Sequence, residues 1–110
     1  MAQTLKVLGQ ASPIAATLTA LYTVPSATQV CGSTIVICNQ NAAGNIRFRV
    51  SIAVAGAADA PRQYIYYDGL LSNRSTFTAT IGIALGATDV VRVQSDTLNV
   101  SFNLFGVEVT

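Results

Sequence analysis

The sequence predicts an all-β protein, a single-domain antiparallel β-sandwich of about eight strands with a jelly-roll-like arrangement. Three observations predict it. Apolar and polar residues alternate with a period of two, which is the period of a strand. Turn-forming residues recur about every 8–12 residues, as they do in sandwiches and barrels. No segment has a convincing helical stripe, because Pro13 interrupts residues 11–20, the one candidate.

The first four predicted strands are apolar runs separated by turn residues. A short run at residues 5–8 comes first, and Pro25 and Ser26 separate a strand at residues 17–24 from one at residues 29–39. The clearest alternation follows at residues 46–54, where five apolar side chains share one face and Arg47, Arg49, Ser51 and Ala53 lie opposite. This alternation is typical of a strand with one buried face.

The second half of the chain repeats the pattern. Turn residues at 56–61 precede a tyrosine-rich strand, which the Asp68-Gly69 turn ends. Residues 77–85 place apolar side chains at odd positions, and shorter strands lie on either side of the turn at residues 95–97. After Leu104 the apolar phase shifts by one residue, which predicts a β-bulge beside Gly106.

The chain is expected to form one domain, residues 1–110, with residues 1–12 as a candidate N-terminal arm. Gly9, Ser12 and Pro13 could release this arm from the sandwich. Such an arm would add a strand to a neighbouring subunit, with Leu5 and Val7 in the interface.

The composition is short of charge. Charged residues make up 10% of the chain, whereas a typical soluble domain has about 25%. Hydrophobic residues make up 51%, yet no run approaches the roughly 20 apolar residues of a membrane span. The net charge is +1 and the basic residues are scattered, so we expect no binding to nucleic acid or to a membrane. A surface with few charges suits a subunit that is covered by its neighbours.

The inventory for catalysis is thin. The chain has no histidine, so it lacks the commonest general base, and its acidic residues lie mostly in predicted turns. Cys31 and Cys38 do not have the spacing of zinc ligands. We therefore expect no enzyme, no cofactor and no metal.

The two cysteines are predicted to be free, buried thiols. On one extended strand their Cα atoms would lie roughly 23 Å apart, too far for a disulfide. A turn at Gly32 and Ser33 is the one arrangement that could bring them together.

A cluster at residues 64–67 holds three of the four tyrosines. Tyr64 and Tyr66 are expected on one strand face, with Ile65 and Tyr67 on the other. Three interpretations remain open for them: packing within the sandwich, a subunit interface, or a platform for a ligand such as a sugar. Arg47 and Arg49, outside the apolar stripe, suit either interface ion pairs or a solvated face.

Segments along nearly the whole chain resemble small β-sandwich virion structural proteins of tailed bacteriophages. They are LYTVP at 21–25, STIVICN at 33–39, FRVSIA at 48–53, QYIYYD at 63–68, TDVVRV at 88–93 and LNVSFNLFG at 98–106. The resemblance implies a multi-copy exterior subunit of the virion, assembled in the host bacterial cytoplasm. This expected place of assembly agrees with the absence of a secretory signal in the sequence.

Capsid decoration, or cement, is the favoured role, because the sequence predicts a single compact domain. Such proteins commonly form trimers at the junctions between capsomers, so the expected partners are further copies of the chain and the major capsid protein. A tail, baseplate or fibre subunit bound to tail proteins is the alternative within this class. A carbohydrate-binding or adhesion module is the alternative of another class, with a surface glycan as its ligand.

Overall fold

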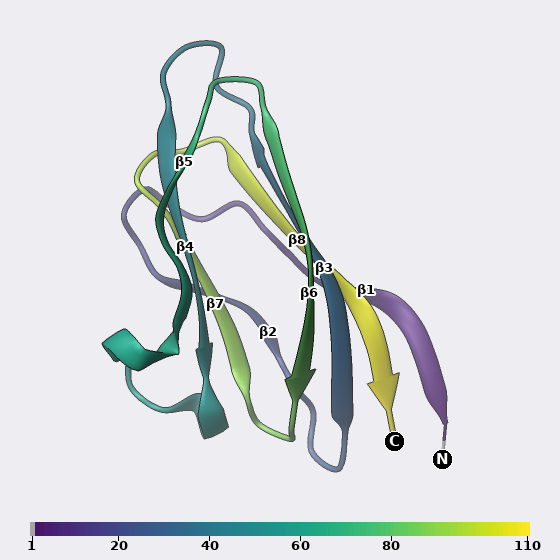
Figure 1. Ribbon diagram of the computed structural model, residues 1–110. Coiled ribbons are helices and arrows are strands. Elements are labelled where there is room, and N and C mark those ends of the chain that lie inside the picture. Colours follow the sequence, from purple (N-terminus) through teal and green to yellow (C-terminus); the bar gives the residue numbers. More distant parts are fainter. Residues whose placement is uncertain (1) are drawn as a thin grey trace.

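Two four-stranded antiparallel sheets face each other in the computed structural model, which describes residues 2–110 (Figure 1). Sheet A has the strand order β1-β8-β3-β6, and sheet B has the order β2-β7-β4-β5. The strands are β1 Gln3–Ala11, β2 Thr19–Thr23, β3 Gln29–Asn39, β4 Ile46–Ala53, β5 Tyr64–Leu71, β6 Thr76–Leu85, β7 Val90–Ser95 and β8 Val100–Val109.

The strand pairing is nested about the β4–β5 connection. β4 pairs with β5, β3 with β6, β2 with β7 and β1 with β8, so the chain follows the path of one long antiparallel hairpin. Pairing of β3 with β8 and of β4 with β7 rolls this hairpin into two sheets. This connectivity is that of a jelly roll, which confirms the predicted fold. Among the described residues, no helix is long and apolar enough to cross a membrane.

One apolar core lies between the sheets. In β4 the predicted alternation is confirmed as far as Val50, because Ile46, Phe48 and Val50 are buried whereas Arg47 and Arg49 lie on the outer side. The prediction is wrong for Val54, which is 68% exposed, and Ser51 and Ala53 are buried although they were expected opposite the apolar face. In β6 the odd-numbered residues face inward and the even-numbered residues are exposed, also as predicted. The most deeply buried side chains come from both sheets: Ile35, Ile37, Val50, Val91, Val93, Val100, Phe102 and Leu104.

The bulge predicted in β8 lies instead in the two strands beside it. β8 keeps a regular alternation through Gly106, which is buried, while the preceding Phe105 faces outward. The register shifts occur in β1 between Val7 and Gly9 and in β3 between Gly32 and Thr34. The apolar phase shift in the sequence therefore marks apolar residues on an outer face, and the strand itself does not change phase.

Residues 3–11 of the candidate arm form β1, at the edge of sheet A. The strand is registered against β8 of its own chain, from Gln3 opposite Val109 to Ala11 opposite Phe102. Met1 lies outside the described residues. The expected contact of this segment with a neighbouring subunit stays a prediction.

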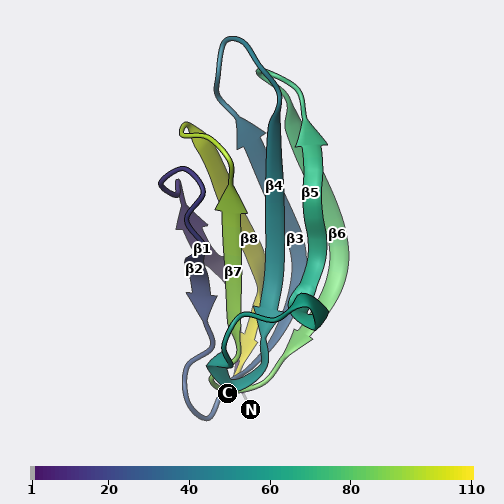
Figure 2. The same cartoon turned by 90° about the vertical axis from the view of Figure 1, so that its left-hand side faces the viewer.

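The connection between β4 and β5 covers one end of the outer face of sheet B (Figure 2). It contains two 3-10 turns, η1 Val54–Gly56 and η2 Pro61–Gln63. Arg92 of β7 donates hydrogen bonds to the carbonyl oxygens of Gly56 and Ala57, and Gln63 is buried with its amide bonded to Ala58. The connection is thus tied to sheet B near its start by Arg92 and closed on itself by Gln63.

Candidate functional site

The outer face of sheet A carries no charged side chain among the described residues. Lys6 and Glu108 are the charged residues of its four strands, and both lie on the inward side, since Lys6 is opposite the buried Gly106 and Glu108 alternates with it. The residues that do face outward are uncharged: Gln3, Leu5 and Val7 in β1; Ser101, Asn103, Phe105, Val107 and Val109 in β8; Gln29, Cys31, Thr34, Val36 and Cys38 in β3; Thr76, Thr78, Thr80 and Ala84 in β6.

The most apolar part of this face lies where β1 pairs with β8. Leu5 is 81% exposed and lies opposite Val107, and Val7 is 44% exposed and lies opposite Phe105. Two of the predicted interface residues are therefore on this face, next to apolar residues that were not predicted. The signal for the latter is the phase shift after Leu104, which predicts a bulge instead.

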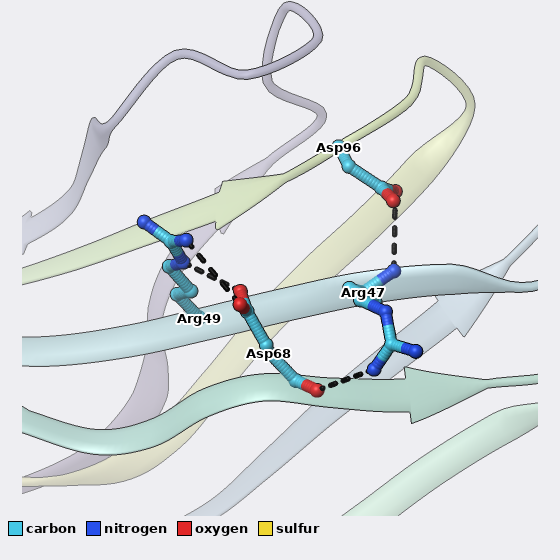
Figure 3. A network of polar contacts seen from close by, with 4 residues as sticks. All are labelled: Arg47, Arg49, Asp68 and Asp96. Atoms are coloured by element: carbon cyan, nitrogen blue, oxygen red, sulfur yellow. Dashed lines mark hydrogen bonds and ion pairs between the residues drawn. The ribbon is translucent and has the colours of Figure 1, made fainter.

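Arg47 and Arg49 lie on the opposite side of the molecule, on sheet B. Arg49 forms a two-pronged ion pair with Asp68 of β5, with Nε 2.7 Å from Oδ1 and Nη2 3.4 Å from Oδ2 (Figure 3). Arg47 donates through Nη1 to the Asp68 carbonyl oxygen, and its backbone N–H donates to Asp96. The ion pair lowers the pKa of Asp68 and raises that of Arg49, first of all through the hydrogen bond between them.

The tyrosines of β5 divide between two environments. Tyr66 packs on the core, with its ring centroid 5.9 Å from that of Phe48 and 5.3 Å from that of Phe77. Tyr64 instead packs edge-to-face with Tyr67, at 5.1 Å between centroids. The predicted pairing of Tyr64 with Tyr66 on one face is wrong, because a register shift against β4 lies between them and the Tyr64 ring lies with Tyr67 on the outer side.

An open cavity of about 450 Å³ lies beside the Tyr64–Tyr67 pair. Its lining comes from β4, β5 and the connection between them: Arg49, Asp59, Ala60, Pro61, Tyr64 and Tyr67. The Arg49 guanidinium carbon is 4.1 Å from the centroid of the Tyr67 ring, a cation–π contact. Burial of the Tyr64 phenol, and then its hydrogen bond to Asp59, raise the pKa of Tyr64.

The six predicted interface residues thus fall into three groups. Leu5 and Val7 are on the outer face of sheet A, whereas Arg47, Arg49 and Tyr64 are on the outer side of sheet B, and Tyr66 packs on the core. The sequence pattern does not indicate Asp59 and Asp68 as partners of these residues, because it predicts both to lie in turns.

Both cysteines are free, but Cys31 is exposed and Cys38 is half-buried. The prediction of buried thiols is therefore wrong for Cys31. The register shift between Gly32 and Thr34 places both residues on the outer face of sheet A, although their odd separation would otherwise put them on opposite faces.

Neither protein-family models nor curated proteins match this chain. Solved structures do. A chain of the T13 infectious bursal disease virus particle matches with a TM-score of 0.54 and 8% identity over 96% of this chain, which spans 30% of that longer chain. A chain of the acid-stable capsid of Helicobacter pylori bacteriophage KHP30 matches with a TM-score of 0.51 and 16% identity, over 99% of this chain and 98% of that one.

At these identities the likeness concerns the fold. The KHP30 chain is matched along nearly its full length, whereas the bursal disease virus chain is matched over less than a third. This protein therefore has an eight-stranded jelly-roll sandwich of a kind that also occurs in chains of two virus particles.

Proposed function

We propose that this chain is a non-enzymatic structural subunit of a tailed-phage virion, a multi-copy exterior protein that decorates and stabilises the capsid. The outer face of sheet A is its contact face. One observation carries the proposal: four adjacent strands present no charged side chain outward among the described residues, whereas β4, β5 and β7 of sheet B carry Arg47, Arg49, Asp68 and Arg92.

This asymmetry is what a one-sided contact requires. The cores of protein interfaces are depleted of charged residues, because a buried charge that lacks a partner costs several kcal/mol. Threonine, valine, asparagine and glutamine keep the face soluble before assembly without creating that cost. Leu5, Val7 and Phe105 add an apolar area at the β1–β8 end of the face.

The match to a chain of a phage capsid structure supports a place on the capsid. The KHP30 capsid chain that it matches has nearly the same length, since the match covers 99% of one and 98% of the other. We propose that copies of this chain associate, as trimers at the junctions between capsomers, and bind the major capsid protein. Attachment to the tail or its fibres is the second location that the same face would serve.

The test is made on particles of the virus that carries this gene. Particles purified on a density gradient are expected to contain the chain in a fixed ratio to the major capsid protein, measured by quantitative mass spectrometry. Purified chain is expected to rebind to particles stripped of it, and to do so equally at low and high salt, because no ion pairs form on an uncharged face. Absence from the particles would contradict the proposal, as would a stable monomer without affinity for them. Density on the tail in a cryo-EM map would establish the second location.

A further inference from the structure

We infer that the cavity between β5 and the β4–β5 connection is a binding site for an uncharged saccharide. This site is on the outer side of sheet B, opposite the proposed contact face, so it would remain open to solvent when the subunit is bound to a particle. It goes beyond the structural role and does not depend on it.

The shape of the cavity suits a small ligand. Its volume of about 450 Å³ is within the roughly 300–1,000 Å³ of typical ligand sites. Tyr67 leaves 61% of its surface exposed at the edge of the cavity, although it packs against both Tyr64 and Arg49. An aromatic ring exposed to this extent beside a cavity offers a ligand an apolar surface to pack against.

The polar groups of the cavity surround these rings. Two bonds to Asp68 hold Arg49 in place, and a guanidinium has five N–H donors, so further donors remain for a ligand. Asp59 offers carboxylate oxygens as acceptors beside its bond from Tyr64, and the Tyr67 hydroxyl can donate and accept. Apolar rings bordered by donors and acceptors match a pyranose, which has C–H faces and a rim of hydroxyl groups.

Charge balance disfavours an anionic ligand. The positive charge of Arg49 is already matched by Asp68, 2.7 Å away, and Asp59 adds a negative charge to the lining. A carboxylate or phosphate ligand would have to compete with Asp68 for Arg49 and would meet Asp59. An uncharged ligand with hydroxyl groups neither competes with the Asp68 carboxylate for the charge of Arg49 nor is repelled by Asp59.

The rigidity of the site also favours binding. Figure 3 shows Arg49 and Asp68 directed toward each other from the neighbouring strands β4 and β5. On the opposite wall, Pro61 begins η2, and the buried Gln63 ties this turn to Ala58 and Ala60. A site whose side chains are already held in place loses less entropy when it binds a ligand.

The experiment uses the isolated full chain and saturation-transfer NMR. The probes are methyl glycosides of glucose, galactose and N-acetylglucosamine, with sialic acid as the anionic probe and tetramethylammonium as the cationic one. We expect saturation transfer to at least one neutral glycoside. Tyr67→Ala should weaken its affinity by about tenfold or more, as truncation of an aromatic anchor does.

Ile65→Ala is the matched control, because Ile65 is an exposed side chain of the same strand, 44% exposed, and does not line the cavity. It should bind as the unmodified chain does, and circular dichroism verifies that both variants fold. Asp68→Asn, which leaves Arg49 without its carboxylate partner, should also weaken neutral glycosides while improving sialic acid. No transfer to any neutral glycoside, equal binding by Tyr67→Ala, or preference for either charged probe would overturn the inference.

Discussion

The Tyr22 hydroxyl on sheet B donates a hydrogen bond to Glu108 Oε2 on sheet A across 2.5 Å. Lys6 Nζ lies 3.4 Å from the other carboxylate oxygen, so Glu108 is held between β2 and β1. This contact links the two sheets at the solvent-exposed edge of the core. The hydrogen bond from Tyr22, and then the charge of Lys6, lower the pKa of Glu108, whereas burial and then Glu108 raise the pKa of Tyr22.

The first prediction is an acid-dependent link between the sheets. The pKa of Glu108 is lower in the folded protein, so its stabilising contribution is present above the unfolded value of about 4.3 and is lost as the pH falls through the folded value. Tyr22→Phe should therefore lower the urea midpoint at neutral pH by more than it does near pH 3. A double-mutant cycle with Glu108→Gln measures the coupling, and a coupling that is the same at both pH values would contradict this account.

The second prediction concerns the close packing of β8 against β3. A Cβ atom at position 106 would lie 2.8 Å from the Cys31 carbonyl oxygen and 2.9 Å from the Gly32 Cα, both backbone atoms. Gly106→Ala should therefore lower the free energy of unfolding by about 1–3 kcal/mol, the usual cost of overpacking. Gly86→Ala is the control, because its nearest neighbour would be 3.8 Å away. Equal urea midpoints for the two variants would show that the β3–β8 spacing adjusts freely.

The strands could be predicted from the sequence because inward and outward side chains alternate in β6, and in β4 as far as Val50. Only the inward set must be apolar, and Phe48 and Phe77 satisfy this directly. The same rule failed in β8, because Phe105 and Val107 are apolar and yet face outward. A pattern of hydrophobicity cannot distinguish a change of strand phase from an apolar outer face.

The cavity could not be predicted because it depends on contacts between distant residues. Asp68-Gly69 has the composition of a turn, but Asp68 lies within β5 with φ 55°, at a register shift against β4. This irregularity accompanies the pairing of Asp68 with Arg49, and a second register shift accompanies the contact of Tyr64 with Tyr67. Pairwise alternation contains no information about either contact.

The third prediction tests the outer face of sheet A with a charge. Thr78→Lys should abolish association with copies of the chain and with particles, because the new ammonium group would be buried without a partner. Its free energy of unfolding should stay within about 0.5 kcal/mol of the original, since Thr78 is exposed in the isolated subunit. Ile65→Lys places the same charge on sheet B and should associate normally. Sedimentation velocity and particle binding measure the association of both variants. Normal association by Thr78→Lys would exclude this part of the face from the contact surface.

The fourth prediction uses the two thiols as reporters of the same face. Cys31 is exposed and Cys38 is half-buried, so Cys31 should react first with iodoacetamide in the dilute, isolated subunit. Cys31 lies opposite Val107 on the outer face of sheet A, so a partner bound there would cover it. On particles its alkylation should therefore slow strongly, and peptide mass spectrometry distinguishes the two sites, with Cys31→Ser as the reference for Cys38 alone. Unchanged reactivity of Cys31 in particle-bound subunits would mean that the contact is made elsewhere, because a thiol within an interface that excludes water cannot react at the rate of an exposed one.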